Sequence, residues 1–440
     1  MSDLSLREKI FVGFASLACA ALYWPALGGS PLWDDQSFWF YSQEMKVSYL
    51  GILENFTWPI AFTVQKFMLD IFGENYFAYH YVNLCLHLLN SSLLFWTAKR
   101  LNWPKPSWIF LLFLLHPANV AAVAWMIQIK TLLCFLFAIL AFAAFERGLE
   151  DRKFMIGAFL LLGLSILSKS ASVTLPILFL IYAYPRVSSR KFLLWFAPLF
   201  LAGILGASIV ISRNRNFDTF AVRAENRLEF IAMTSRYYIT KSVFPLENSP
   251  IKGRSPLHAG YFDLTVLGVL IALVFFIRKT TNIVYLIGGI VLLLPFLGLI
   301  LAPYMAVTWV SDQHLYLALP LLLAFWISLL TKLPQKVQHA LLVSFLVLYS
   351  FKTFQTAHFY QNEDQFYSES LHTDPGSTTA AFNYANSLAY ADRIDEALAV
   401  TDRIHELAEK DKSIALNSRF GEIENLRQRL LAFKKIKDKK

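Results

Sequence analysis

The sequence predicts an all-α, polytopic membrane protein with about 11 transmembrane helices, followed by a short helical segment at the C-terminus. Hydrophobic residues make up 56% of the 440 residues and charged residues only 16%, with a mean hydropathy of +0.47. Soluble domains carry roughly 25% charged residues, so this composition favours the membrane class. Apolar runs near the ~20 residues that cross a bilayer recur through residues 1–355.

The expected spans follow these apolar runs in order, and several of them are short or interrupted. Pro117, Pro176, Pro295 and Pro320 lie within spans or at their ends, where kinks and unwound turns line cavities. The expected spans cover residues 9–28, 77–98, 106–127, 130–146, 153–168, 171–184, 192–211, 261–277, 283–302, 314–330 and 338–355.

Basic residues predict the orientation of these spans. Lys and Arg precede the first span and follow the second, fourth, sixth, eighth and tenth, so every second loop is basic. Cytoplasmic loops carry such an excess, which places the N-terminus in the cytoplasm and loops 30–76 and 212–260 outside. An odd number of spans then places the C-terminus outside as well. The formal charge of +9 follows from this rule, so we expect no nucleic-acid partner.

The cysteines and acidic residues predict no bound metal. Cys19, Cys85 and Cys134 lie in apolar runs without metal-like spacing, and we expect buried packing thiols. The two adjacent aspartates of the first loop lack a complete set of oxygen ligands for a divalent cation.

The first external loop opens with the most informative motif, the adjacent carboxylates of Asp34 and Asp35 beside Trp33. Such a pair suits a base that removes a proton from a hydroxyl next to a lipid-borne leaving group. His116, Lys169, Asp312 and His314 are expected on the same face. Ionisable groups are costly in a membrane, so their gathering predicts one external active-site cavity. The alternative is that interfacial polar residues merely extend into the headgroups.

The second external loop, residues 212–260, is rich in basic residues, and residues 228–244 are expected to form an amphipathic or re-entrant helix. Arg binds phosphate oxygens bidentately, which predicts a clamp on a lipid-linked phosphate. Attraction to anionic headgroups is the alternative. The candidate arginines are Arg213, Arg215, Arg227 and Arg236.

After about residue 356 the composition becomes polar and helical. Residues 380–398 resemble a tetratricopeptide helix–turn–helix unit, with Ala385, Leu388 and Ala397 at packing positions and Asp392 where Gly is usual. A segment with fewer than three such repeats rarely folds alone. We therefore expect residues 356–440 to be stabilised by packing against the membrane domain. Two interpretations stay open, a platform for an acceptor or partner and a lid that only stabilises the protein.

The motifs together resemble the transmembrane and tetratricopeptide-repeat O-mannosyltransferases and their bacterial relatives, which are GT-C glycosyltransferases. The resemblance covers nearly the whole chain. Its five motifs, in order, are Trp33-Asp34-Asp35; His80, Asn83, His87 and Asn90; His116-Pro117-Ala118-Asn119-Val120 with Val123-Ala124-Trp125; Ser168-Lys169 with Val173-Thr174-Leu175-Pro176; and Ser311-Asp312-Gln313-His314-Leu315-Tyr316-Leu317.

This resemblance implies an inverting hexosyltransferase that moves a sugar from a polyprenyl phosphate to a hydroxyl of a protein or glycan. Asp34, or else Asp35, would be the base. A bacterial inner-membrane location with a periplasmic site and no cofactor is implied. Lys169, His314 and the four arginines are candidates for the donor phosphate, and His116, Asp312, Tyr316 and Trp33 for the substrate. His80 and His87 are expected to pack, and His116 before Pro117 has a structural cap as its alternative role.

Three positions depart from the family pattern. Trp58 stands where the family has Arg, Ala121 where it has Glu, and Ile129 where it commonly has Arg. These departures motivate a non-catalytic scaffold as one alternative. A ligase or polymerase of lipid-linked glycans is another. A transporter fits less well, because transporter sites lie near the membrane midplane.

Overall fold

The computed structural model describes residues 4–36, 48–184, 186, 197–206, 208, 212, 227–247, 249–253, 260–276, 282–299, 303–411, 414 and 419–437. Over these residues the chain is helical and contains no strand, which confirms the all-α class.

The first half of the chain contains the long helices that frame the site. Short 3-10 turns interrupt the helical runs near prolines, because proline removes a backbone donor and restricts the preceding residue. The elements are α1 (Leu6–Leu27), α3 (Tyr49–Asn55), α4 (Pro59–Phe72), α5 (Tyr76–Arg100), α6 (Pro106–Leu114), η1 (Pro117–Asn119), α7 (Val120–Val123), η2 (Met126–Gln128), α8 (Ile129–Gly148), α9 (Lys153–Ser168), η3 (Ser170–Thr174) and α10 (Leu175–Ala183).

The second half completes the bundle and forms the C-terminal segment. Its elements are α12 (Arg227–Lys241), α13 (Tyr261–Phe276), α14 (Ile283–Leu293), η5 (Leu294–Phe296), η6 (Pro303–Ala306), η7 (Asp312–His314), α15 (Leu319–Leu330), α16 (Gln335–His358), α17 (Glu363–Thr373), α18 (Thr378–Tyr390), α19 (Ile394–Lys410) and α21 (Phe420–Lys437). The helix expected over residues 228–244 is α12.

Within the described residues, three helical stretches are long and apolar enough to cross a membrane: Leu6–Leu27, Met126–Gly148 and Gln335–His358. A fourth arises if Pro106–Leu114 and Pro117–Val123, bent by 50° relative to each other, count as one span. These stretches are consistent with a membrane protein, but they number three or four rather than about eleven.

Several of the other expected spans are present as helices shorter than a bilayer-crossing helix. They include Lys153–Ser168, Ser170–Ala183, Ile283–Phe296 and Leu319–Leu330. Proline lies at the first turn of α10 and of α15 and inside η5, so these runs begin or break at the expected prolines. The expected span 77–98 is the 25-residue α5, whose buried side chains include polar ones.

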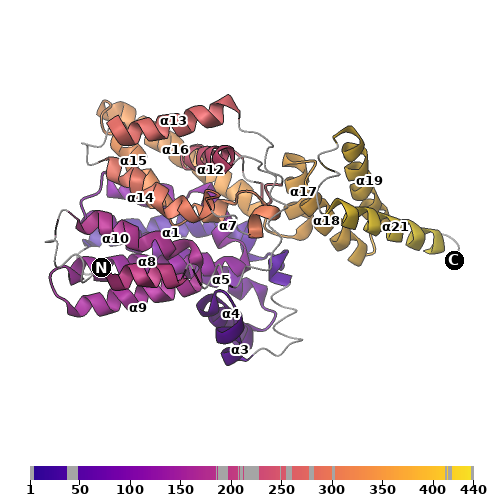
Figure 1. Cartoon of the computed structure of the whole chain (residues 1–440), viewed down its shortest axis with the longest axis horizontal. Helices are drawn as coiled ribbons and strands as arrows, with labels where there is room; N and C mark the ends of the chain where they lie inside the picture. Colours follow the sequence, from indigo (N-terminus) through magenta and orange to yellow (C-terminus); the bar gives the residue numbers. More distant parts are fainter. Residues whose placement is uncertain are drawn as a thin grey trace.

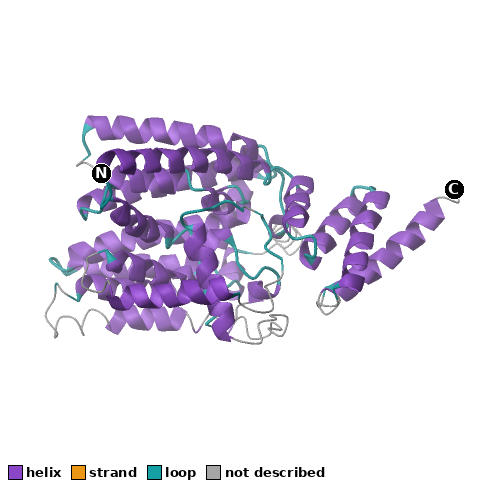
Figure 2. Cartoon of the chain, turned by 90° about the horizontal axis from the view of Figure 1, so that it is seen from above, coloured by secondary structure: helices purple, strands orange, loops and turns teal. Residues whose placement is uncertain are grey.

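The helices up to α16 lie side by side in one bundle, and α17 to α21 extend from one end of it (Figure 1). Helices α8 and α9 pack together, α1 packs on α16, and α14 packs on α15. A view turned by 90° shows the same elongated arrangement, with the C-terminus far from the bundle (Figure 2). Helix α16 runs to His358 and so continues across the domain boundary expected at residue 355.

The C-terminal segment contains the helix–turn–helix expected over residues 380–398, formed by α18 and α19. Asp392 lies in the turn with a φ of 60°, in the left-handed region that favours glycine. This conformation explains why Gly is usual at that position. Helix α21 packs against both helices.

Candidate functional site

The acidic turn, residues 32–36, follows directly from the end of α1 at the end of the bundle that carries the C-terminal helices. Trp33 has a φ of 42°, an uncommon left-handed conformation for a large side chain. Its ring stacks on Trp125 with centroids 5.7 Å apart and also contacts Phe366. Trp33 therefore packs the acidic turn between the bundle and α17.

Asp35 holds the acidic turn in place. Its side chain is 1% exposed, and its two oxygens accept hydrogen bonds from the backbone N–H groups of Leu32 at 3.0 Å and Ile127 at 2.7 Å. The indole N–H of Trp125 donates to the carbonyl of Leu32 at 3.3 Å. Burial raises the pKa of Asp35 to about 7, although the two N–H donors favour the carboxylate. Asp35 is thus a tether between the first loop and the turn before α8.

Asp34 has a different environment. Its side chain is partly buried and makes no hydrogen bond to any residue that the structure describes. Burial raises the pKa of Asp34 above its ordinary value, and the positive charge of Lys130 acts in the opposite direction. A carboxylate with free oxygens and a raised pKa has the properties of a general base.

Lys130 is the functional candidate that sequence reasoning missed. It lies in the first turn of α8, is 7% exposed, and places its ammonium 4.7 Å from the centroid of the Trp58 ring. Its charge acts on both aspartates of the acidic turn. The sequence signal was a lysine at the beginning of an apolar run, next to the position where the resembled family commonly has Arg. The ring of Trp58 supports the ammonium of Lys130.

Lys169 lies behind Lys130, in the break between α9 and η3. Its ammonium donates to the hydroxyl of Thr131 at 2.8 Å and to the side-chain oxygen of Gln128 at 3.3 Å. Burial, followed by repulsion from Lys130, lowers the pKa of Lys169 to about 7. Lys130 therefore lies between Lys169 and the acidic turn: its charge acts on both aspartates and on Lys169.

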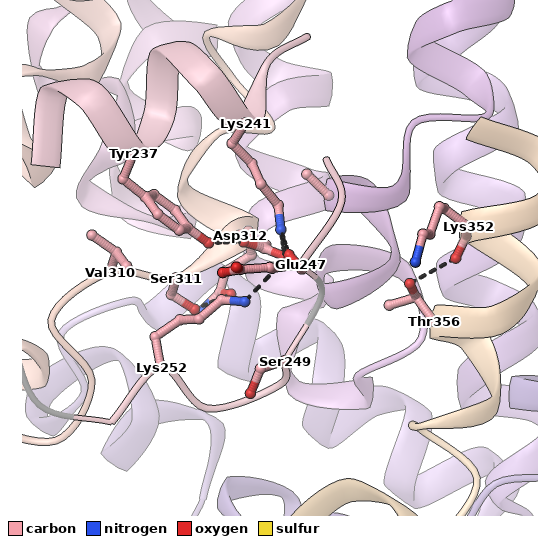
Figure 3. A network of polar contacts seen from close by, with 12 residues as sticks. Tyr237, Lys241, Glu247, Ser249, Lys252, Val310, Ser311, Asp312, Lys352 and Thr356 are labelled. Atoms are coloured by element: carbon pink, nitrogen blue, oxygen red, sulfur yellow. Dashed lines mark hydrogen bonds and ion pairs between the residues drawn. The ribbon is translucent and has the colours of Figure 1, made fainter. Parts of the chain in front are cut away.

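A second polar cluster gathers around Asp312 (Figure 3). Lys241 lies 3.2 Å from a carboxylate oxygen of Asp312, and the Tyr237 hydroxyl donates to the same carboxylate. Lys252 faces this pair and donates to the carbonyl of Glu247 at 3.4 Å.

The charges in this cluster perturb one another. Burial alone would raise the pKa of Asp312, but Lys241, Lys252 and the Tyr237 hydroxyl hold it below its ordinary value. Burial, followed by repulsion from Lys241, lowers the pKa of Lys252 to about 7.

Other predicted site residues are held within the protein. His314 stacks on Phe296, with centroids 4.0 Å apart, and its Nδ1 lies 3.3 Å from the Tyr238 hydroxyl. Asp312 thus pairs with Tyr237 and Lys241. The buried hydroxyl of Tyr316 lies 2.8 Å from Nδ1 of His87.

His116 is a structural cap, which was one of its two expected roles. Its Nδ1 accepts a hydrogen bond from the backbone N–H of Ala118 at 3.2 Å and so begins η1. Its ring packs edge-on against Tyr349 at 4.6 Å.

The candidate arginines divide into two groups. Arg236 forms an ion pair with Asp263, and Arg227 donates to the carbonyl of Gly298 at 3.3 Å. Arg213 and Arg215 lie outside the described residues. The two described candidate arginines are therefore held by partners within the protein, and the buried basic side chains beside Asp34 and Asp312 are lysines.

A polar cavity of about 350 Å³ lies next to the acidic turn, where the first loop meets α17. Gln36 donates to the carboxylate of Glu363 at 2.9 Å, and the Ser387 hydroxyl donates to the same carboxylate. The cavity is lined by Ser30, Pro31, Gln36, Tyr76 and Glu363. In the part of the chain that the structure describes, no three His, Cys, Asp or Glu side chains gather as a metal site would require.

These features combine a free carboxylate, four buried lysines and a polar cavity at one end of a helical bundle. Comparisons of the chain with models of protein families, with curated proteins and with solved structures found no match.

Proposed function

We propose that the protein is a membrane glycosyltransferase that moves a sugar from a polyprenyl-phosphate donor to a hydroxyl acceptor, with Asp34 as general base. The observation that carries the proposal is the contrast within the acidic turn. Both side-chain oxygens of Asp35 accept hydrogen bonds from backbone N–H groups. Asp34, in contrast, has a raised pKa and no hydrogen-bond partner among the described residues. This leaves Asp34 available to accept a proton.

The proposed reaction is a single displacement. Asp34 takes the proton of the acceptor hydroxyl while the acceptor oxygen forms a bond to the anomeric carbon of the sugar. The bond from that carbon to the phosphate oxygen breaks, and the electron pair leaves with the polyprenyl phosphate. Attack from the side opposite the leaving group inverts the anomeric centre.

The departing phosphate needs positive charge, which the buried lysines supply. Around the acidic turn the formal charges cancel, because two carboxylates, Asp34 and Asp35, face two ammonium groups, Lys130 and Lys169. Two lysines, Lys241 and Lys252, gather around the carboxylate of Asp312, and the charge of Glu247 also acts on both lysines. Phosphate oxygens accept strong hydrogen bonds from lysine ammonium groups, so this cluster is suited to an anionic ligand. We assign the phosphate to it, with Lys169 and His314 on the side of the acidic turn.

The acceptor, a protein or glycan, would enter through the polar cavity between the first loop and α17. Residues 356–440 would then bind that acceptor or a partner protein. In a cell the proposal places the enzyme in the bacterial inner membrane, with a cytoplasmic N-terminus and a periplasmic site and C-terminus.

The test compares aspartate variants in transfer assays with polyprenyl-phosphate sugars and the purified protein. Asp34→Asn should lower turnover by about 10²- to 10⁴-fold, the usual contribution of a general base, without lowering the melting temperature. Asp35→Asn should lower the melting temperature as well as activity. Asp70→Asn is the matched control, because Asp70 is an exposed carboxylate of the same loop that pairs with Lys66. Full activity of Asp34→Asn would exclude Asp34 as the base.

A non-catalytic scaffold is the second candidate. It is favoured by the internal hydrogen bonds and ion pairs of Asp312, Arg236 and Tyr316, three predicted site residues. Donor binding by the wild-type protein, with no transfer or hydrolysis of the bound sugar, would support this candidate and overturn the enzyme proposal.

A further inference from the structure

A second, larger cavity lies at the other end of the bundle from the acidic turn. We call it the lipid slot; it has a volume of about 460 Å³ and lies between α5, α8, α10, α14 and α15. Its inner end is wholly apolar and lies near Leu175, Leu292, Leu317 and Pro320. None of the residues of the acidic turn or of the Asp312 cluster lines it, so the proposed reaction does not account for it.

The outer end of the lipid slot is chemically different. Arg186 lies there, exposed, with its guanidinium 4.1 Å from the centroid of the Tyr182 ring. Trp103 and Tyr285 meet edge-to-face with centroids 5.5 Å apart. Trp and Tyr gather where a bilayer meets water, and Arg there attracts anionic headgroups.

Thr97 brings a buried hydroxyl to the wall of the slot. Its side chain is 6% exposed and lines the slot, and its hydroxyl finds no partner among the described residues. On the same helix the hydroxyls of Ser91 and Ser92 donate to the carbonyls four residues earlier, each at 2.8 Å. A buried hydroxyl without a partner costs free energy, so a ligand that supplies an acceptor there would be stabilising.

From this arrangement we infer that the lipid slot binds an anionic phospholipid, whose acyl chain fills the apolar inner end and whose headgroup meets Arg186. Its ester or phosphate oxygens accept from the Thr97 hydroxyl. A polyprenyl phosphate has acceptor oxygens only in its phosphate, whereas a phospholipid also has ester oxygens between its headgroup and its acyl chains. With the charged group at Arg186, the phospholipid therefore has a further acceptor for Thr97. The inference does not depend on the proposed sugar transfer.

The test uses the full-length protein in detergent and measures its melting temperature with short-chain lipids of one acyl length. A phosphatidylglycerol should raise the melting temperature more than the zwitterionic phosphatidylcholine does. Arg186→Gln should remove the difference between the two lipids, while Lys332→Ala, which removes an exposed lysine outside the slot, should preserve it. Thr97→Val should weaken binding of both lipids without abolishing the preference.

A larger side chain inside the lipid slot should block it, and Ala138 lines the slot. Ala138→Phe should abolish the response to both lipids, and its unliganded melting temperature reports whether the fold survives. If it does not fold, mass spectrometry of the native wild-type protein decides, because co-purified phospholipid that Arg186→Gln loses would support the inference. Equal responses to both lipids, an unchanged preference in Arg186→Gln, or co-purified isoprenoid in place of phospholipid would overturn it.

Discussion

At the scale of single residues, two neighbours of identical chemistry acquire different properties from their surroundings. Asp35 is nearly fully buried and accepts two backbone hydrogen bonds, whereas Asp34 is partly exposed and faces only the charge of Lys130. A lysine near a carboxylate stabilises its ionised form. Lys130 therefore sets the pH at which Asp34 can act, although it need not touch the substrate.

Replacing Lys130 by Met should move the acid limb of the pH–rate profile to higher pH. The pKa of Asp34 is already raised by burial and is held down by Lys130, so loss of this cation raises it further. A base works only when deprotonated, and activity would then fall at a higher pH on acidification. The measurement is kcat/KM against pH, with Lys66→Met as the control for a lysine of the first external loop. An acid limb at the same pH in both variants would contradict this role.

At the scale of elements, the breaks in the helices create the site. Lys169 lies in the break between α9 and η3, Asp312 begins η7, and His116 caps η1. Backbone interruptions within a membrane are tolerated where they are buried in protein. The interruptions place buried polar side chains at the ends of helices that are otherwise largely apolar.

His116 gives an element-scale prediction that separates capping from substrate binding. His116→Ala should lower stability by about 1 kcal/mol, the usual contribution of a helix cap, because the N–H of Ala118 loses its acceptor. His116→Asn should restore most of this loss, since Asn is itself a good cap. Thermal unfolding gives the stability, and transfer assays should show both variants active. Loss of activity in the stable Asn variant would instead indicate substrate contact.

The sequence was sufficient for the helical class, because this follows from composition and apolar runs, whereas the roles of the acidic turn and of Lys169 stay predictions. The sequence did not identify Lys130 as a candidate site residue, because a lysine is also common where a membrane span begins at the interface with water. Its role depends on Trp58 and Asp34, which are distant in sequence. Among the described residues only three or four helical stretches are long enough to cross a membrane, because apolar runs in the sequence do not show where a helix ends at a proline.

At the scale of the whole molecule, the C-terminal helices are part of the site's support. Phe366 of α17 is fully buried and contacts both Trp33 and Trp125, whose rings stack on each other. Gln36 reaches Glu363 of the same helix. The packing of α17 thus fixes the acidic turn from the side opposite the bundle.

Phe366→Ala should therefore destabilise the protein by about 3–5 kcal/mol, as expected for a buried Phe. It should also reduce sugar transfer by protein that is still folded, which a C-terminal segment that only stabilises the protein would not explain. Phe433→Ala is the matched control, because Phe433 on α21 is 50% exposed and should leave the melting temperature nearly unchanged. Chemical denaturation gives the free energy of unfolding of each variant. Transfer assays at a temperature where both variants are folded give the activity. Unaltered transfer by folded Phe366→Ala would show that α17 does not position the acidic turn.

The contact between the first loop and α17 also has a consequence for how the protein is made. The backbone N–H of Ser30 donates to the carbonyl of Gln361, and Gln36 pairs with Glu363, across separations of 331 and 327 residues. The ribosome therefore synthesises Gln36 327 residues before its partner Glu363. A chain that stops before α17 is inserted without the contacts that hold the acidic turn, so we expect such a chain to be inactive.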